Sequence, residues 1–396
     1  MSSKYNFPFS IEQVAVLLNL RVRRNSSDRL DMDVDCPFCG KKGKLNINKI
    51  KNTYRCPCCD AAGGMVKLYA KTLGIDNAAA YREINELLRT GESKSVEAAR
   101  RVKPAPSLPE NTKADVESIH QTYSMMLAQL SLTPAHTDHL LSRGLELSDI
   151  KELGYKSASA FGHKNLCKNL SKSGCTLEGV PGFYLAADCE TCRKKGITGK
   201  ECPKCGSKNL MKYWDVKLKA SGFLIPVWSI QGKIEGLQYR LDKPISNQKY
   251  IWLSSNRLEG GASSGSPIHF VGDPTANAVY VTEGPLKGGI AHAFTRKSFV
   301  CVPGVKSIGK LDSIFTTLKA NGTEIIYEAF DMDKYENKDV GSAADKLKDM
   351  AKELGFKVKS VWWADHSLKG IDDYYFSRKK ERSKGIYTVG AKERTA

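Results

Sequence analysis

The stretch Ala278-Val279-Tyr280-Val281-Thr282-Glu283-Gly284 is an apolar run that stops at an acid. Two similar runs follow: residues 324–330 stop at Asp331-Met332-Asp333, and residues 357–363 precede Lys369-Gly370-Ile371-Asp372-Asp373. Helical stretches lie between the runs, which is the order of elements in an open α/β sheet. Ligands bind to such a sheet at the edge where the carboxyl ends of its parallel strands meet. The sequence therefore predicts that one edge gathers Glu283, Asp331, Asp333 and one or both of Asp372 and Asp373.

Carboxylates that lie this close repel one another unless a cation lies among them. Oxygen ligands of this kind are the ones that Mg²⁺ and Mn²⁺ prefer. A single acid at the start of a loop is common on any protein surface, so the prediction depends on the whole set. We therefore expect this edge to bind Mg²⁺ or Mn²⁺.

The composition is strongly basic. The chain has 396 residues, of which 61 are Lys or Arg and 43 are Asp or Glu, and its net charge is +18. Residues 151–250 alone carry 18 basic and 8 acidic side chains. Proteins with this charge commonly bind nucleic acid. The alternative is a basic surface that serves only solubility.

The N-terminal residues lack the basic segment and apolar segment that mark a signal peptide. No apolar stretch approaches the roughly 20 residues that cross a bilayer. We therefore expect a cytoplasmic protein without a membrane partner. Disulfides are rare in that compartment, and the spacing of the twelve cysteines indicates metal binding by some of them instead.

Eight of the cysteines form two quartets. In the first, Cys36 and Cys39 are separated by sixteen residues from Cys56 and Cys59, with Cys58 as a spare. Paired C-x₂-C motifs are typical of a structural zinc site, and the sequence between them predicts a β-hairpin. The second quartet has pairs nine residues apart, at Cys189, Cys192, Cys202 and Cys205.

Lysines surround the second quartet. Two readings stay open: a zinc knuckle whose lysines face phosphate, or a structural clip for a long loop. The lysines concerned are Lys194, Lys195, Lys200, Lys204 and Lys208.

With these motifs in this order, the chain resembles the bacterial DnaG-type primases and their phage and mobile-element relatives. The first quartet, its hairpin and Ala62-Gly63-Gly64 are similar to the primase zinc-binding domain. Residues 140–155 resemble the helical entry to the primase core, and residues 222–240 resemble its basic strand region. The three acidic motifs resemble those of a TOPRIM domain.

The resemblance implies an α/β and α+β multidomain protein. We expect a zinc ribbon with helices at residues 1–89, followed by a flexible linker at 90–115. The N-terminal part of a primase core is expected at 116–270, with a zinc knuckle inserted at 186–212. A TOPRIM domain is expected at 271–380 and a flexible tail at 381–396.

The chain departs from the family pattern at the acidic site. The second acid of the family, four residues after the motif glutamate, is replaced by Lys287. The second cysteine quartet is an insertion, and no P-loop motif of a fused helicase is present. The pattern is that of a stand-alone primase-like protein of a phage or mobile element.

The resemblance implies synthesis of short RNA primers on a single-stranded DNA template from ribonucleotide triphosphates, with a separate replicative helicase as partner. The catalytic Mg²⁺ or Mn²⁺ would be held by Glu283, Asp331 and Asp333. Glu283 would be a ligand or a general base, and Asp372 and Asp373 would complete the metal shell or orient it. Nucleic acid or nucleotide would contact Arg240, Lys249, Tyr54, Arg55, Lys194 and Lys195.

Two other classes of function use the same features. A TOPRIM nuclease would use similar acids to hydrolyse phosphodiesters, and a non-catalytic binding factor would use the zinc ribbons to hold single-stranded DNA. A type I topoisomerase needs a large additional domain with a nucleophilic tyrosine, for which the chain has little room.

Overall fold

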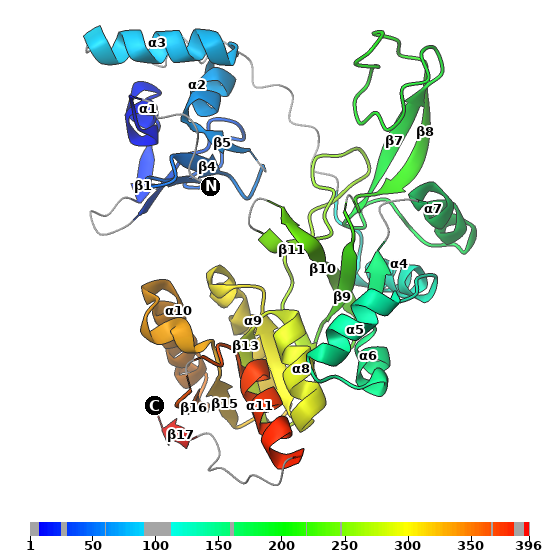
Figure 1. Cartoon of the computed structure of the whole chain (residues 1–396), viewed down its shortest axis with the longest axis vertical. Coiled ribbons are helices and arrows are strands. Elements are labelled where there is room, and N and C mark those ends of the chain that lie inside the picture. Colours follow the sequence, from blue (N-terminus) through cyan, green and yellow to red (C-terminus); the bar gives the residue numbers. More distant parts are fainter. Residues whose placement is uncertain are drawn as a thin grey trace. The chain divides into compact units, whose positions relative to one another are not determined.

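The computed structural model describes residues 8–24, 30–59, 61–90, 112–158, 162–218, 220–245, 248–365, 367–383 and 392–395. The chain divides into two compact units, residues 1–110 and residues 111–396 (Figure 1). Most of the linker expected at residues 90–115 lies outside the described residues. Among the described helices, none has the length and apolar character needed to cross a membrane.

The first unit is an antiparallel sheet with helices. Its strands lie in sequence order: β1 (Val22–Arg24), β2 (Asp31–Val34), β3 (Leu45–Asn48), β4 (Thr53–Arg55) and β5 (Ala62–Gly64). The pairing of β3 with β4 confirms the predicted hairpin. The helices in the described part of this unit are α1 (Ile11–Leu17), α2 (Met65–Leu73) and α3 (Asn77–Thr90).

The second unit begins with helices and a four-stranded sheet. The helices are α4 (Val116–Ala128), α5 (Pro134–Ser142), α6 (Leu147–Leu153) and α7 (His163–Lys172). The sheet has the order β11 (Gln248–Trp252), β10 (Ile234–Ile245), β9 (Gly222–Trp228), β6 (Lys156–Ala158). Strands β9 and β10 are antiparallel neighbours.

A separate hairpin projects from this part of the chain (Figure 1). It consists of β7 (Phe183–Cys189) and β8 (Leu210–Val216), which pair along their whole length. The second cysteine quartet lies in the connection between these strands and at the end of β7.

A six-stranded mixed sheet forms the C-terminal part of the second unit. Its order is β12 (His269–Val271), β14 (Ser298–Val302), β13 (Ala278–Glu283), β15 (Ile325–Glu328), β16 (Lys357–Trp362), β17 (Lys392–Thr395). The four central strands are parallel and the two edge strands are antiparallel to their neighbours. The three predicted strands are therefore confirmed as β13, β15 and β16.

Side chains of this sheet alternate between two apolar layers. Val279 and Val281 face a cluster that includes Phe315 of α9 (Leu311–Ala320) and Leu347 of α10 (Lys338–Glu353). Tyr280 faces the other cluster, which includes Tyr374 of α11 (Ile371–Ser383). Helix α8 (Pro285–Thr295) lies on this second side and connects β13 to β14.

Helix α8 also holds the two sheets of the second unit together. Its Leu286 and Ile290 pack in one cluster with Phe223 of β9 and Leu140 of α5. The start of α8 therefore has a fixed position relative to the four-stranded and the six-stranded sheet. The first acidic motif, Glu283-Gly284, directly precedes this start.

The C-terminal end differs from the expected flexible tail. Residues 392–395 form β17, which pairs with β16. The polar composition of residues 381–396 gives no sign of this strand. An edge strand forms backbone hydrogen bonds with one neighbour only and can carry polar side chains.

Candidate active site and cysteine centres

Two strand ends and one helix start present the acids. Glu283 is the last residue of β13, and Gly284 follows with φ of 81° before α8 begins. This backbone conformation favours glycine. Asp331 and Asp333 follow β15 and flank the start of the 3₁₀ helix η3 (Met332–Tyr335). Asp372 and Asp373 lie in the first turn of α11.

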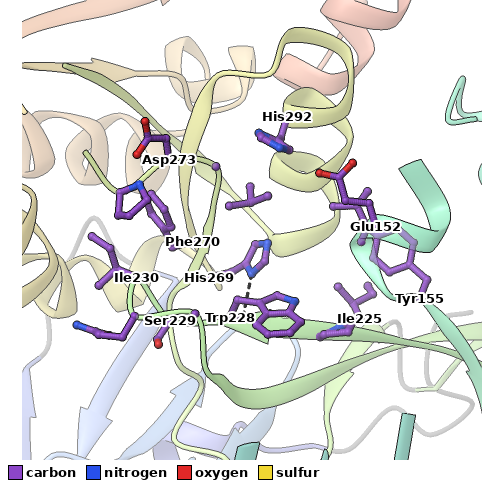
Figure 2. Close-up of a pocket in the computed structure, with 17 residues that line it drawn as sticks. Glu152, Tyr155, Ile225, Trp228, Ser229, Ile230, His269, Phe270, Asp273 and His292 are labelled. Carbon is purple, nitrogen blue, oxygen red and sulfur yellow. Dashed lines mark hydrogen bonds between the residues drawn. The ribbon is translucent and has the colours of Figure 1, made fainter. Parts of the chain in front are cut away.

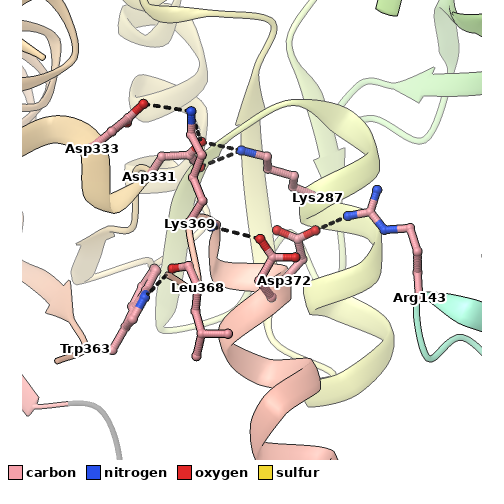
Figure 3. Close-up of polar contacts among 10 residues, drawn as sticks. Arg143, Lys287, Asp331, Asp333, Trp363, Leu368, Lys369 and Asp372 are labelled. Carbon is pink, nitrogen blue, oxygen red and sulfur yellow. Dashed lines mark hydrogen bonds and ion pairs between the residues drawn. The ribbon is translucent and has the colours of Figure 1, made fainter. Parts of the chain in front are cut away.

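Two lysines lie among these acids (Figure 3). The Nζ atom of Lys287 donates to both carboxylate oxygens of Asp331, at 2.6 and 2.5 Å. The Nζ atom of Lys369 lies 2.7 Å from Asp333 and 3.8 Å from Asp331. Sequence reasoning missed both contacts, although it noted that Lys287 stands where the family has an acid.

Asp372 is held differently from the other acids. Its side chain is 1% exposed and forms an ion pair with Arg143, which follows α5. Gly370 lies between Asp372 and Asp331. A Cβ atom added at position 370 would be 2.5 Å from Asp372 Oδ1 and 3.4 Å from Asp331 Oδ1. The backbone N–H of Gly370 donates to Asp373 at 3.3 Å. The third motif thus packs directly against Asp331.

The electrostatics of the edge disfavour further negative charge. Burial, together with the neighbouring charge of Asp331, raises the pKa of Glu283 to about 7. Burial also raises the pKa of Asp372, and the charge of Arg143 opposes this shift. Both shifts indicate that an additional cation would be favourable at this edge.

Three buried oxygens at the edge have no hydrogen-bond partner: Glu283 Oε1, Asp333 Oδ1 and Asp372 Oδ1. A buried acceptor without a partner is costly, and a bound cation would satisfy it. In the described part of the chain, groups of three or more metal-ligand atoms within 4.8 Å of one another occur only at the cysteine quartets. Glu283, Asp331 and Asp333 do not form such a group, and Lys287 and Lys369 contact two of the three acids.

A buried ion pair between Glu328 and Lys334 supports the turn that contains Asp331 and Asp333. Lys334 lies 2.9 and 2.8 Å from the two carboxylate oxygens of Glu328, and both side chains are almost fully buried. Glu328 also accepts from the backbone N–H of Phe330. The pair thus joins the last residue of β15 to η3. Sequence reasoning missed it because Lys334 reads as a surface residue.

The predicted nucleic-acid residues have different environments. Tyr54 is 2% exposed and packs against Phe38, so the expectation that it is an exposed aromatic group is wrong. Alternation along β4 turns Tyr54 inward and leaves Arg55 exposed. Lys194 and Lys195 are exposed.

Arg240 and Lys249 lie on neighbouring strands. Arg240 is paired in register with Tyr250, directly after the exposed Lys249, and its guanidinium lies 5.5 Å from the centre of the Phe223 ring. Burial lowers the pKa of His139, and the charges of Arg240 and Arg143 lower it further. Arg240 therefore shares a basic region with the arginine that pairs with Asp372.

The first cysteine quartet has the geometry of a zinc site. Cys36 Sγ lies 3.5 Å from Cys59 Sγ, and Cys39 Sγ lies 3.8 Å from Cys56 Sγ. Four thiolates about 2.3 Å from one tetrahedral ion are roughly 3.8 Å apart, whereas disulfide sulfurs are about 2.05 Å apart. Cys58 is not part of this group, as the spacing predicts.

The second quartet has the same geometry. Cys189 Sγ lies 3.6 Å from Cys205 Sγ, and Cys192 Sγ lies 3.4 Å from Cys202 Sγ. The backbone N–H of Cys192 points at Cys189 Sγ, at 3.5 Å, as in a knuckle that stabilises a thiolate. Both quartets are thus suited to one zinc ion each.

A cavity of about 640 Å³ is lined by residues that do not include the acids; Figure 2 shows the lining. Its lining includes Trp228, Phe270, Asp273 and His292. The lining includes the last residues of β12 and continues to Asp273. Because β12 runs antiparallel to β14, these residues lie beside the beginning of β14. The cavity is therefore at the end of the sheet opposite Glu283. Burial lowers the pKa of His269 in this cavity to about 3, and its neutral Nδ1 accepts from the backbone N–H of Trp228.

Comparison with known proteins gives one family and a set of structures. Residues 270–382 match the family described as "Domain of unknown function (DUF3854)". No curated protein matches the chain.

Solved primase structures are similar to this chain. The zinc-binding and RNA polymerase domains of the Aquifex aeolicus primase are 14% identical, with 98% of this chain and 84% of that chain covered and a TM-score of 0.46. The RNA polymerase domain of Mycobacterium tuberculosis primase DnaG, solved with a double-stranded DNA oligomer that has a 6-nucleotide overhang, is 14% identical over 68% of this chain and 81% of that one, with a TM-score of 0.46. A Pseudomonas aeruginosa DNA primase domain is 15% identical over 69% and 79%, with a TM-score of 0.42. We base the functional argument on the residues of this chain.

The purified protein is expected to carry two zinc ions, because each four-cysteine group holds one. Cys36→Ser and Cys202→Ser should each remove one ion, and Cys36→Ser should also unfold the first unit locally, since Cys36 belongs to its core. The control Cys58→Ser should keep both ions. Elemental analysis of protein purified without chelators measures this, and protein without zinc would refute both sites.

Glu328→Ala should destabilise the second unit by about 3–5 kcal/mol, because it leaves the Lys334 ammonium buried without a counter-charge. Lys334→Met added to Glu328→Ala should restore part of the loss. The control Glu324→Ala breaks an exposed pair with Lys357 and should cost about 0–1 kcal/mol. Urea unfolding followed by tryptophan fluorescence reports this unit, because all five tryptophans lie between residues 214 and 363. Equal effects of Glu328→Ala and Glu324→Ala would contradict the proposed support.

Proposed function

We propose that this protein is a primase-like nucleotidyltransferase that synthesises short RNA primers on single-stranded DNA. The observation that carries the proposal is the edge at which Glu283 meets Asp331 and Asp333, with buried oxygens that have no partner. The order of its motifs, with a zinc ribbon before this edge, supports the choice of reaction.

The residues that would hold Mg²⁺ or Mn²⁺ are Glu283, Asp331 and Asp333, and the ion would neutralise charge on the transferred phosphoryl group. Glu283 has a pKa near neutrality, which suits a group that accepts the proton of the attacking 3′-hydroxyl. The same residue can instead act as a ligand. Asp372 and Asp373 hold the third motif against Asp331.

Positive groups of the four-stranded sheet would bind the template and the ribonucleotide triphosphate. Arg240 and Lys249 lie on β10 and β11, and Tyr250 is partly exposed beside them. Phosphate contacts from such side chains position a nucleic acid without reading its sequence. Within the first unit, Arg55 is the remaining candidate for a contact with nucleic acid, because Tyr54 is buried.

The inserted hairpin is proposed as a further contact with DNA. Its connection carries exposed Lys194, Lys195 and Lys200 next to the second cysteine group. A separate replicative helicase, a cytoplasmic location and an origin in a phage or mobile element complete the proposal, and all three follow from the resemblance of the motifs.

Asp331→Asn, Asp333→Asn and Glu283→Gln should each reduce primer yield by at least about 100-fold, because each removes charge from the metal site. The control Asp345→Asn changes an exposed residue of α10 and should keep the wild-type yield. The assay contains single-stranded DNA, Mg²⁺ and labelled ribonucleotides. New short RNA indicates a primase, whereas cut DNA indicates a nuclease and an unchanged strand indicates a binding factor. Full primer synthesis by the Asp331 and Asp333 variants would refute the mechanism.

Replacing Lys194, Lys195 and Lys200 together with alanine should weaken binding to single-stranded DNA and flatten its salt dependence by about 2 in the log–log slope, at roughly 0.7 per phosphate contact. The control triple variant Lys346→Ala, Lys352→Ala, Lys357→Ala removes three exposed lysines elsewhere and should leave the slope unchanged. Fluorescence anisotropy at several salt concentrations measures both. An unchanged slope in the first variant would assign the inserted hairpin a purely structural role.

A further inference from the structure

Lys287 is built into the acidic edge. It lies on the first turn of α8, four residues after Glu283, so the strand–helix turn brings its side chain back over the strand ends. Its ammonium group contacts both oxygens of Asp331, whose side chain is 5% exposed. A Cβ atom at Gly370 would lie 3.3 Å from Lys287 Cδ, so the backbone of the third motif encloses the lysine stem.

Lys369 has a different status. Its side chain is 59% exposed, and it reaches Asp333 from a loop on the solvent side. Ion pairs that involve an exposed lysine contribute little to stability, so an incoming cation can displace Lys369 from Asp333. Displacing Lys287 would leave the buried Asp331 without its partner.

The charges at the edge do not balance. Five carboxylates lie there (Glu283, Asp331, Asp333, Asp372 and Asp373), and three cations accompany them (Lys287, Lys369 and Arg143). A bound cation lowers the pKa of neighbouring carboxyls and so favours the ionised form of Glu283 and Asp372. The five carboxylates then exceed the three cations by two charges, which that one divalent ion compensates. With an acid in place of Lys287 the excess would be four, which two divalent ions would compensate.

We propose that the ammonium group of Lys287 is a fixed cation that takes the place of one divalent metal ion. Of the three acids at the proposed metal site, Glu283 and Asp333 then hold a single Mg²⁺ or Mn²⁺, whereas both oxygens of Asp331 stay with Lys287. The inference rests on the proposed function only in treating this edge as a metal site. When the ion binds, Lys369 leaves Asp333, whereas Lys287 stays on Asp331. The partnerless oxygens Glu283 Oε1 and Asp333 Oδ1 are the ones that the ion satisfies.

The number of bound ions tests this inference directly. Zinc-loaded full-length protein is titrated with Mn²⁺ in the absence of DNA and nucleotide, and free Mn²⁺ is followed by electron paramagnetic resonance. The wild-type protein should bind one ion that Asp333→Asn removes, and Lys287→Asp should bind two. Two ions in the wild-type protein, or an unchanged single ion in Lys287→Asp, would overturn the inference.

Two further variants keep the test decisive if Lys287→Asp does not fold. Lys287→Met keeps the aliphatic stem but removes the charge, so it should bind Mn²⁺ at least about tenfold more tightly, because a nearby like charge has been removed. The matched control Lys369→Met should still bind one ion, with a smaller gain in affinity. Unchanged or weaker binding by Lys287→Met would contradict the inference.

Primer synthesis is measured separately on the same preparations. A wild-type protein that binds one Mn²⁺ but makes no RNA would refute the proposed reaction and support the role of Lys287. A wild-type protein that makes RNA and binds two Mn²⁺ ions would support the proposed reaction and refute the role of Lys287.

Discussion

Repulsion among carboxylates at the ends of β13 and β15 is the constraint on which this part of the molecule depends. Parallel pairing of these strands brings Glu283 close to Asp331 and Asp333. Burial makes their negative charge more costly. Lys287 and Lys369 offset part of this charge from two different elements, and Arg143 offsets the charge of Asp372. The remaining negative excess is the reason why we propose a cation site at this edge.

The surrounding fold holds these charges in place. Helix α8 carries Lys287, and its Leu286 and Ile290 pack against Phe223 of the neighbouring sheet. The buried Glu328–Lys334 pair fixes the turn that presents Asp331 and Asp333. The third motif reaches the site through the close approach of Gly370 to Asp331. A change in any of these supports would alter the distances on which the charge balance depends.

The sequence predicts the elements of this site better than its contacts. Short apolar runs that end in acids predict β13, β15 and β16, and paired C-x₂-C motifs predict both cysteine groups. The partners of the acids depend on which helices pack beside the sheet, so Arg143, 229 positions before Asp372, could not be found from local pattern. Tyr54 was misread because three residues of β4 are too few to reveal which face is buried. Strand β17 was missed because an edge strand needs no apolar face.

The central claim is that one metal ion binds at this edge beside a lysine that stays in place. A crystal structure of the protein soaked in Mn²⁺, with anomalous diffraction collected at the manganese edge, tests it most directly. The account predicts one anomalous peak in contact with Glu283 and Asp333, with Lys287 still on Asp331 and Lys369 turned away. Two peaks at this edge, no peak, or a displaced Lys287 would contradict it.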